Sequence, residues 1–321
     1  MGTPDFARDS LDKLYKSGKY DICGVVTTPD RPAGRGMKLV ESDVKKYAVE
    51  NGLKVYQPEK ISNNNEFKDE IRALNPDLVC VVSYGVILPK SFLNIPKLGC
   101  INVHPSMLPK YRGSAPIQWA VLNGDETTGV TIMYLNEKMD AGDIIMQKEV
   151  KIDPDETTGE LWDRLSLIGA DLLLEVVEKL EDGSATRTKQ PEEFTLAPML
   201  DRAISKINWN ELSGLEIKNL ARGLNPFMGA YSFLNGKKVK FWKVQLIEEN
   251  NFNELTNGLE HINFEEAKNG EILLADSKKG LYVRSKDKIV SVLEIQGENA
   301  KRMSIGDFLR GNKLNIGEIF E

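Results

Sequence analysis

The sequence is poor in the side chains that bind metals and form disulfides. Its 321 residues include two histidines and three cysteines, which do not assemble any of the usual zinc or iron spacings and are too few and too scattered for a disulfide framework. We therefore expect no metal site. Each cysteine lies in a short apolar run, as a small buried side chain does, and free thiols indicate a reducing cytoplasm. These residues are His104, His261, Cys23, Cys80 and Cys100.

A long hydrophobic run is also missing. The longest apolar stretch, residues 78–88, is interrupted by Ser83 and Gly85 and is shorter than the ~18 residues that a membrane span needs. The N-terminus carries neither the basic segment nor the apolar segment of a secretory signal. These absences predict a soluble, cytoplasmic protein without a membrane partner.

Several nucleotide and hydrolase motifs are absent. Gly34-Arg35-Gly36 lacks the third glycine of a dinucleotide fingerprint, and no GxxxxGK segment occurs in the chain. No G-x-S-x-G elbow of a serine hydrolase occurs either. Nicotinamide-dependent, P-loop and serine-hydrolase chemistry are therefore not indicated. The loop at residues 29–39 nevertheless carries Arg31, Arg35 and Lys38, which suits a phosphate or carboxylate ligand.

The charges that are present are unevenly distributed. Residues 1–200 carry 24 basic and 31 acidic side chains, whereas residues 201–321 carry 18 basic and 17 acidic ones. Residues 217–247 contain six cations and no acidic side chain. This pattern indicates either an anion-binding surface attached to an acidic body or a solvated face. The six are Lys218, Arg222, Lys237, Lys238, Lys240 and Lys243.

In the first part of the chain, short apolar runs alternate with helical patterns. This alternation predicts βαβ units and an α/β domain whose mostly parallel sheet is covered on both faces. A long helix with leucine and valine at helical spacing closes this part, after a capping box at Thr157 and Glu160. The expected strands are residues 21–27, 53–56, 77–83, 99–103 and 129–135, and the expected helices include residues 6–17 and 42–51.

The last third of the chain shows a different pattern. Five short strand-like runs occur in about 110 residues, and Asn235-Gly236 between two of them is a strong hairpin signal. A small OB-like β-barrel accounts for such a pattern on a basic segment. The polar stretch at residues 185–204 reads as a linker. We therefore expect a catalytic domain over residues 1–184 and a nucleic-acid-binding barrel over residues 205–321.

The candidate catalytic side chains lie where one apolar strand ends. Asn102 and His104 point to the same face of the strand, and Pro105 ends its ladder. In open α/β sheets, ligands bind at the carboxyl ends of the strands. An amide can stabilise a carbonyl oxygen that becomes negative, and an imidazole can move a proton near neutral pH. A carboxylate that orients this imidazole could come from Asp140 or Asp143. Either aspartate could equally form an Asx turn, and the spacing does not choose between these roles.

These residues belong to motifs that resemble the folate-dependent formyltransferases, and specifically those that act on initiator methionyl-tRNA. The resemblance covers essentially the whole chain and implies a Rossmann-like domain followed by an OB-like barrel. It rests on Gly2-Thr3-Pro4-Asp5-Phe6, residues 29–39, residues 84–89, Asn102-Val103-His104, Ser106-Met107-Leu108-Pro109, Tyr111-Arg112-Gly113, Asp140-Ala141-Gly142-Asp143, Asn225-Pro226 and residues 240–243.

The resemblance implies a role for each matching residue. Asn102, His104 and Asp140 would be the catalytic set. The tetrahydrofolate site would be lined by Ser106, Met107, Leu108 and Pro109, and tRNA would be contacted by Arg35, Lys38, Lys237, Lys238, Lys240 and Lys243.

The expected reaction is formyl transfer from 10-formyltetrahydrofolate to the α-amino group of initiator methionyl-tRNA, by a monomer that binds no DNA. Two alternatives remain open at this point. A formyltransferase for a small amine, or a formyl-folate hydrolase, would not need the basic hairpin. A non-catalytic RNA-binding protein would not need Asn102, His104 and Asp140.

The resemblance also raises an expectation about the N-terminus. Related sequences carry a short apolar strand immediately before the Gly-Thr-Pro-Asp-Phe run, whereas this chain begins at Met1. We therefore expect that the natural product starts several residues upstream, with an apolar strand of about five residues, because a sheet without it would leave backbone groups unpaired.

Overall fold

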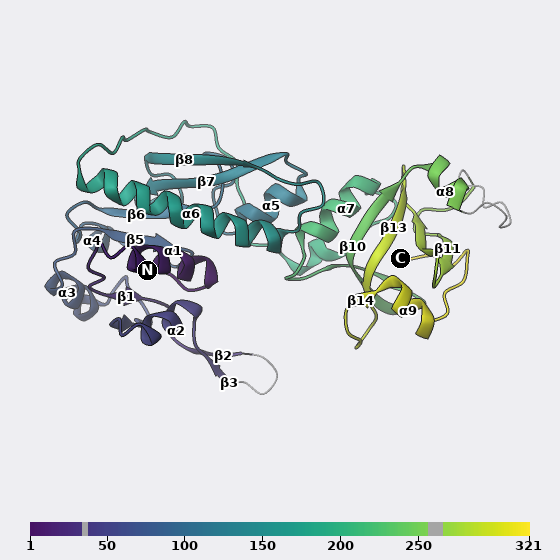
Figure 1. Ribbon diagram of the computed structural model, residues 1–321, viewed down its shortest axis with the longest axis horizontal. Coiled ribbons are helices and arrows are strands. Elements are labelled where there is room, and N and C mark those ends of the chain that lie inside the picture. The colour runs from purple at the N-terminus through teal and green to yellow at the C-terminus, as the bar shows by residue number, and fades with distance from the viewer. Residues whose placement is uncertain (34–37, 256–265) are drawn as a thin grey trace. The chain divides into compact units, whose positions relative to one another are not determined.

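The computed structural model describes residues 1–33, 38–255 and 266–321 (Figure 1). They form two compact units. Unit 1 comprises Met1–Ile117, Thr127–Lys151 and Leu161–Met199, and unit 2 comprises Gln118–Glu126, Ile152–Glu160 and Leu200–Glu321. No helix in the described part of the chain is long and apolar enough to cross a membrane.

Residues 1–199 alternate helices and strands, as the sequence pattern predicted. Two elements were not expected: the short hairpin β2–β3 in the cationic loop, and strand β8. In chain order the elements are α1 (Asp5–Lys16), β1 (Val25–Val26), β2 (Arg31–Ala33), β3 (Lys38–Val40), α2 (Asp43–Glu50), β4 (Val55–Tyr56), α3 (Asn65–Ala73), β5 (Val79–Val82), α4 (Lys90–Leu93), β6 (Cys100–His104), α5 (Pro116–Leu122), β7 (Thr127–Tyr134), β8 (Ile144–Lys151) and α6 (Thr158–Glu181).

The strands of unit 1 form the Rossmann-like sheet expected from the sequence. β1 pairs with β4 in parallel, and β5 pairs with β6 in parallel. β7 and β8 extend the β5–β6 pair as antiparallel strands, so the order is β5-β6-β7-β8. In this order β6 lies between β5 and β7, so its carboxyl end is at an inner position of the sheet.

Helices cover both faces of this sheet. On one face, Phe67 of α3 and Phe92 of α4 stack with their ring centroids 6.1 Å apart over Val81 and Cys100. On the other face, α6 lies across the strands (Figure 1), and a Cβ built on its Gly169 would lie 2.9 Å from a methyl carbon of Val103. A larger side chain there would push α6 away from β6, so this glycine lets the helix and sheet pack closely.

The first two residues lie between β1 and β5. The Gly2 N–H donates to the Val26 carbonyl at 3.0 Å, and the Val82 N–H donates to the Met1 carbonyl at 2.9 Å. Residues 1 and 2 hydrogen-bond to the strands on both sides but do not form a strand of their own. A cavity of about 50 Å³ lies beside Met1. The hydroxyl of Ser10, which lines this cavity, is buried without a hydrogen-bond partner.

The segment expected as a linker runs along unit 1 for most of its length. Thr188 forms an antiparallel bridge with Ile144, and Leu196 forms a parallel bridge with Arg112. The Ala197 N–H donates to the Arg112 carbonyl at 2.8 Å. Backbone hydrogen bonds therefore attach residues 188–197 to the strand and loop that they pass.

After residue 200 the chain forms an antiparallel sheet with short helices. The five strands predicted there are present, and α8, β14 and α9 are additional. The elements are η1 (Arg202–Ser205), α7 (Gly214–Gly223), β9 (Ala230–Leu234), β10 (Lys237–Ile247), α8 (Glu249–Leu255), β11 (Ile272–Asp276), β12 (Gly280–Arg284), β13 (Ile289–Gln296), β14 (Met303–Ser304) and α9 (Ile305–Gly311).

Residues 318–321 connect the two edges of this sheet. The strand order is β11-β12-β13-β10-β9, with β14 beside β13. Glu321 exchanges two backbone hydrogen bonds with Phe233 of β9, at 2.8 and 3.1 Å. The Ile272 N–H at the start of β11 donates to the Glu318 carbonyl at 2.8 Å. The last residues thus join β9 to β11 and complete the OB-like barrel around Trp209, Phe241 and Phe320.

Candidate active site

Strand β6 brings Asn102 and His104 to its carboxyl end. Cys100, Ile101 and Val103 are buried, so the strand is fixed from both sides. Asn102 is partly exposed, and its side-chain amide has no hydrogen-bond partner within the described chain. His104 is only 3% exposed. The two side chains therefore differ: the amide is available to a ligand, whereas the imidazole is held by the protein.

Both nitrogens of the His104 ring face oxygen acceptors. Nε2 lies 2.9 Å from the Tyr111 carbonyl oxygen and donates its proton to it in the neutral ring. Nδ1 lies 3.8 Å from Oδ2 of Asp140. When the imidazolium forms, a second N–H points toward the carboxylate. The site can therefore accommodate a proton on His104 as a reaction proceeds.

The structure distinguishes the two aspartates that the sequence left open. Asp140 adopts φ +50°, and its Oδ2 accepts from the Gly113 N–H at 2.8 Å as well as facing His104. Asp143 instead pairs with Arg187 at 2.8 Å, and its side chain is 34% exposed against 15% for Asp140. The carboxylate beside the imidazole is therefore that of Asp140.

The loop that follows β6 covers the histidine in an unusual backbone conformation. Tyr111 has φ +65°, which is costly for a residue with a side chain and occurs mostly where surrounding contacts impose it. Gly113 has φ +131°, and a Cβ there would lie 2.5 Å from the Ala197 carbonyl oxygen. Only glycine fits at this position, and it leaves the Gly113 N–H directed at Asp140.

The expected folate-site residues form a compact turn with a cis bond between Leu108 and Pro109. Ser106 is fully buried, and its hydroxyl donates to the Lys110 carbonyl at 2.6 Å. The Leu108 N–H donates to the hydroxyl of Thr131 at 3.1 Å. Ser106 and Leu108 thus hold the turn, whereas Met107 and Pro109 are partly exposed.

The four lysines of the β9–β10 hairpin have different surroundings. Lys237 and Lys243 are exposed. Lys238 Nζ lies over the Tyr231 ring, 3.5 Å from its centroid. Lys240 Nζ donates to the Met228 carbonyl at 2.7 Å, and burial lowers the pKa of this amine. Lys240 therefore already has a structural partner.

The two other residues expected to bind tRNA lie within or next to residues 34–37, which the structure does not describe. Arg35 lies outside the described residues. Lys38 begins β3, which pairs with β2 through Ala33, but its side chain is not among those described. Their proposed contacts stay predictions.

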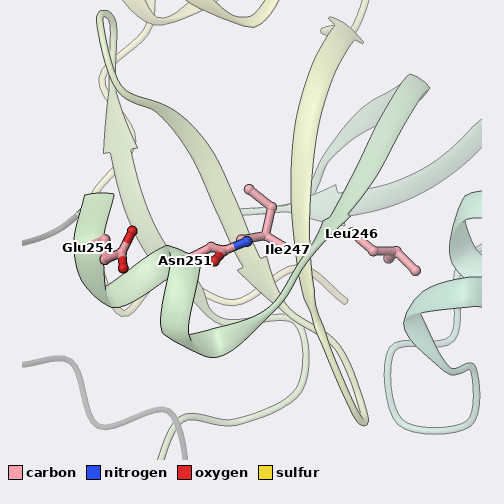
Figure 2. Close-up of a pocket in the computed structure, with 4 residues that line it drawn as sticks. All are labelled: Leu246, Ile247, Asn251 and Glu254. Atoms are coloured by element: carbon pink, nitrogen blue, oxygen red, sulfur yellow. The ribbon is translucent and has the colours of Figure 1, made fainter.

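No metal-binding cluster marks this site in the described part of the chain, and an open hollow beside α8 is formed by other residues. Within residues 1–33, 38–255 and 266–321, no three His, Cys, Asp or Glu side chains gather in a way that could hold a metal ion. The hollow is lined by Leu246, Ile247, Asn251 and Glu254 (Figure 2). None of these four is among the expected site residues.

Comparison with known proteins agrees with this geometry. The family described as "Formyl transferase" matches residues 1–177, and "Formyl transferase, C-terminal domain" matches residues 199–313. The chain belongs to the formyl transferase family. Among curated relatives of this formyl transferase, methionyl-tRNA formyltransferase of Clostridioides difficile is 44% identical over 99% of the chain and 97% of the relative.

A second relative and a solved structure extend the comparison. Methionyl-tRNA formyltransferase of Syntrophus aciditrophicus is also 44% identical, over 99% of this formyl transferase and 97% of the relative. The N-formyltransferase of Helicobacter canadensis, solved with folinic acid and dTDP-3-aminofucose, has a TM-score of 0.61 and 20% identity, and covers 91% of this chain and 97% of that one. At this identity the likeness concerns the fold.

Several residues that shape the site of this formyl transferase were not predicted from the sequence. Gln190 is buried in the segment read as a linker, and Thr131 and Gln147 hold the turn after β6 from β7 and β8. A lone polar residue in a polar stretch gives no periodic signal. Thr131, a hydroxyl in an otherwise apolar strand run, was the one detectable clue.

Proposed function

We propose that this formyl transferase moves the formyl group of 10-formyltetrahydrofolate to the α-amino group of initiator methionyl-tRNA. The observation that supports this best is the set of Asn102, His104 and Asp140 at the carboxyl end of β6, in a chain similar over 99% of its length to methionyl-tRNA formyltransferases. The function expected from the sequence is the one that these relatives carry.

Each of the three side chains has a distinct part in this proposal. 10-Formyltetrahydrofolate supplies an activated formyl group, and the methionyl amine attacks it directly. Asn102 donates its free amide N–H to the formyl oxygen as that oxygen gains negative charge. His104 takes up the proton that the amine loses, and the Asp140 carboxylate 3.8 Å away stabilises the imidazolium. As the bond between the formyl carbon and the folate nitrogen breaks, His104 passes this proton to that nitrogen, which leaves as tetrahydrofolate. No side-chain nucleophile is required.

The surroundings of Asn102 fit a folate cosubstrate. A partly exposed amide without a protein partner, next to a buried imidazole, is suited to a polar formyl group. We propose that the folate contacts mainly Met107 and Pro109, because Ser106 and Leu108 form the hydrogen bonds that hold the turn. These residues would bind the cosubstrate and exclude water from it.

We propose that the basic β9–β10 hairpin of unit 2 contacts the phosphate backbone of the tRNA. Lys237 and Lys243 are exposed, and Lys238 is held over an aromatic ring, so three ammonium groups are available to phosphates. Lys240 contributes less, since its Nζ is engaged by a carbonyl. Arg35 and Lys38 would reach the acceptor end. The protein would act as a cytoplasmic monomer.

A formylation assay with competing acceptors tests the proposal. Purified protein and 10-formyltetrahydrofolate are incubated with initiator methionyl-tRNA, with free methionine, with a nucleotide-linked amino sugar, or with water alone. We expect rapid formylation of methionyl-tRNA only. Faster transfer to the amino sugar, or release of formate without an acceptor, would replace the proposal by one of the two enzyme alternatives. Binding of tRNA without turnover would indicate the non-catalytic alternative.

A further inference from the structure

Gln190 is a buried amide in a segment that otherwise lies on the surface. Its neighbours Thr188 and Lys189 are exposed, whereas Gln190 is 6% exposed and points into unit 1. A buried primary amide is costly unless its donor and acceptor are both satisfied. Here both are satisfied: the amide contacts Sδ of Met133 in β7 at 3.7 Å, and its oxygen and nitrogen partners all lie in the two segments beside His104.

The amide of Gln190 connects these two segments. Its Nε2 donates to the carbonyl oxygens of Asp140 at 3.0 Å and Gly142 at 2.8 Å. Its Oε1 accepts from Arg112, at 3.0 Å from Nε and 2.7 Å from Nη2. Arg112 is 8% exposed and its guanidinium lies over Phe194, so the cation is itself fixed. With the contact from Nε2 to Sδ of Met133, five hydrogen bonds thus converge on one side chain.

Both partners of the His104 ring lie next to atoms that Gln190 holds. Tyr111, whose carbonyl accepts from Nε2, precedes Arg112. Asp140, whose carboxylate faces Nδ1, is held by Gln190 through its own carbonyl. Tyr111 and Asp140 both have positive φ, a conformation that persists only where the surroundings impose it. Gln190 contributes part of that constraint on both sides.

We propose that Gln190 is a positioning residue of the formyl transfer reaction: it holds the Tyr111 carbonyl and the Asp140 carboxylate in register on the two nitrogens of His104. The proposal rests on the function proposed above. Gln190 touches neither substrate nor the reacting atoms, and acts through Arg112 and Asp140. It follows that Gln190 belongs to the active-site architecture, although it lies in the stretch expected as a linker.

Two substitutions separate positioning from folding. Gln190→Met keeps the size of the side chain and removes all five hydrogen bonds. Gln190→Glu keeps an acceptor for Arg112 and is expected to preserve the fold through that ion pair, but it loses the donor to the Asp140 and Gly142 carbonyls. Thr188→Ala is the control, because this exposed residue meets Ile144 through its backbone alone.

The first readout is kinetic. We expect both Gln190 variants to lower kcat by about a hundredfold, the order of loss that follows a misplacement of about 1 Å, with little change in KM for 10-formyltetrahydrofolate. Thr188→Ala should match the parent. A kcat within a few-fold of the parent in Gln190→Met would overturn the proposal.

The second readout is spectroscopic and needs no substrate. With two histidines in the chain, ¹⁵N NMR of the imidazoles gives two sets of signals, which His261→Gln assigns. We expect the parent His104 to show a fixed Nε2–H tautomer, and Gln190→Met to show exchange between tautomers. Unchanged His104 signals in a folded variant would refute the positioning role even if kcat falls. Failure of the parent to formylate methionyl-tRNA would instead refute the proposed function and leave this readout valid.

Discussion

Replacing Asp140 by asparagine isolates the charge beside the imidazole. The substitution keeps the shape of the side chain and an oxygen that accepts from the Gly113 N–H, now 2.8 Å from Oδ2. It removes a negative charge that lies 3.8 Å from Nδ1 of His104. The backbone of the loop is therefore expected to stay in place while the stabilisation of the imidazolium is lost.

The size of the effect follows from the distance and the burial. Two unit charges about 4 Å apart attract by about 1 kcal/mol in water and about 4 kcal/mol at an effective dielectric constant of about 20. The Asp140 and His104 side chains are 15% and 4% exposed, so the value lies between these limits. At about 1.4 kcal/mol for each factor of ten, kcat should fall by about fivefold to a thousandfold.

Single-turnover formylation of methionyl-tRNA measures this loss without product release. Asp143→Asn is the matched control, because its partner Arg187 is 62% exposed and a surface pair contributes about 0–1 kcal/mol. We expect the control to keep the parent rate within a few-fold. An Asp140→Asn rate equal to that of the parent, or an equal loss in both variants, would show that the imidazolium is not stabilised by this carboxylate.

Two further outcomes are expected. Asn102→Ala should lower kcat by about 10²–10³, the typical loss for one oxyanion donor, while tRNA binding measured by filter retention stays unchanged; weakened binding with normal kcat would contradict its role. Neutralising Lys237, Lys238 and Lys243 should lower the log–log salt slope of tRNA binding by about 0.7–0.9 for each phosphate that the protein no longer neutralises, and an unchanged slope would place the tRNA-binding surface elsewhere.

Strand β6 and its two polar residues were predictable because their signals are local. An apolar run that ends in Asn102, His104 and Pro105 fixes both the strand and the side chains that leave it on one face. The hairpin at Asn235-Gly236 was predictable for the same reason, since the turn requires positive φ at both residues and the structure has it.

The parts that escaped prediction depend on contacts between distant segments. Local spacing leaves Asp140 and Asp143 equivalent, so the expectation of Asp140 rested on the resemblance alone, and the fold places Asp140 at His104 and Asp143 at Arg187. Strand β8 is half exposed and carries several charges, so its apolar signal is weak. Gln190 comes close to Arg112 only because the segment that carries it turns back along the sheet.

The closure of the barrel by residues 318–321 has a consequence for the behaviour of the protein in concentrated solution. Unpaired strand edges are templates for association with other chains. Loss of these four residues would expose β9 at Phe233 and β11 at Ile272 together, because the same short segment bonds to both. Protection of this domain against edge-to-edge aggregation and strand exchange between copies therefore depends on a segment that a single proteolytic cut could remove.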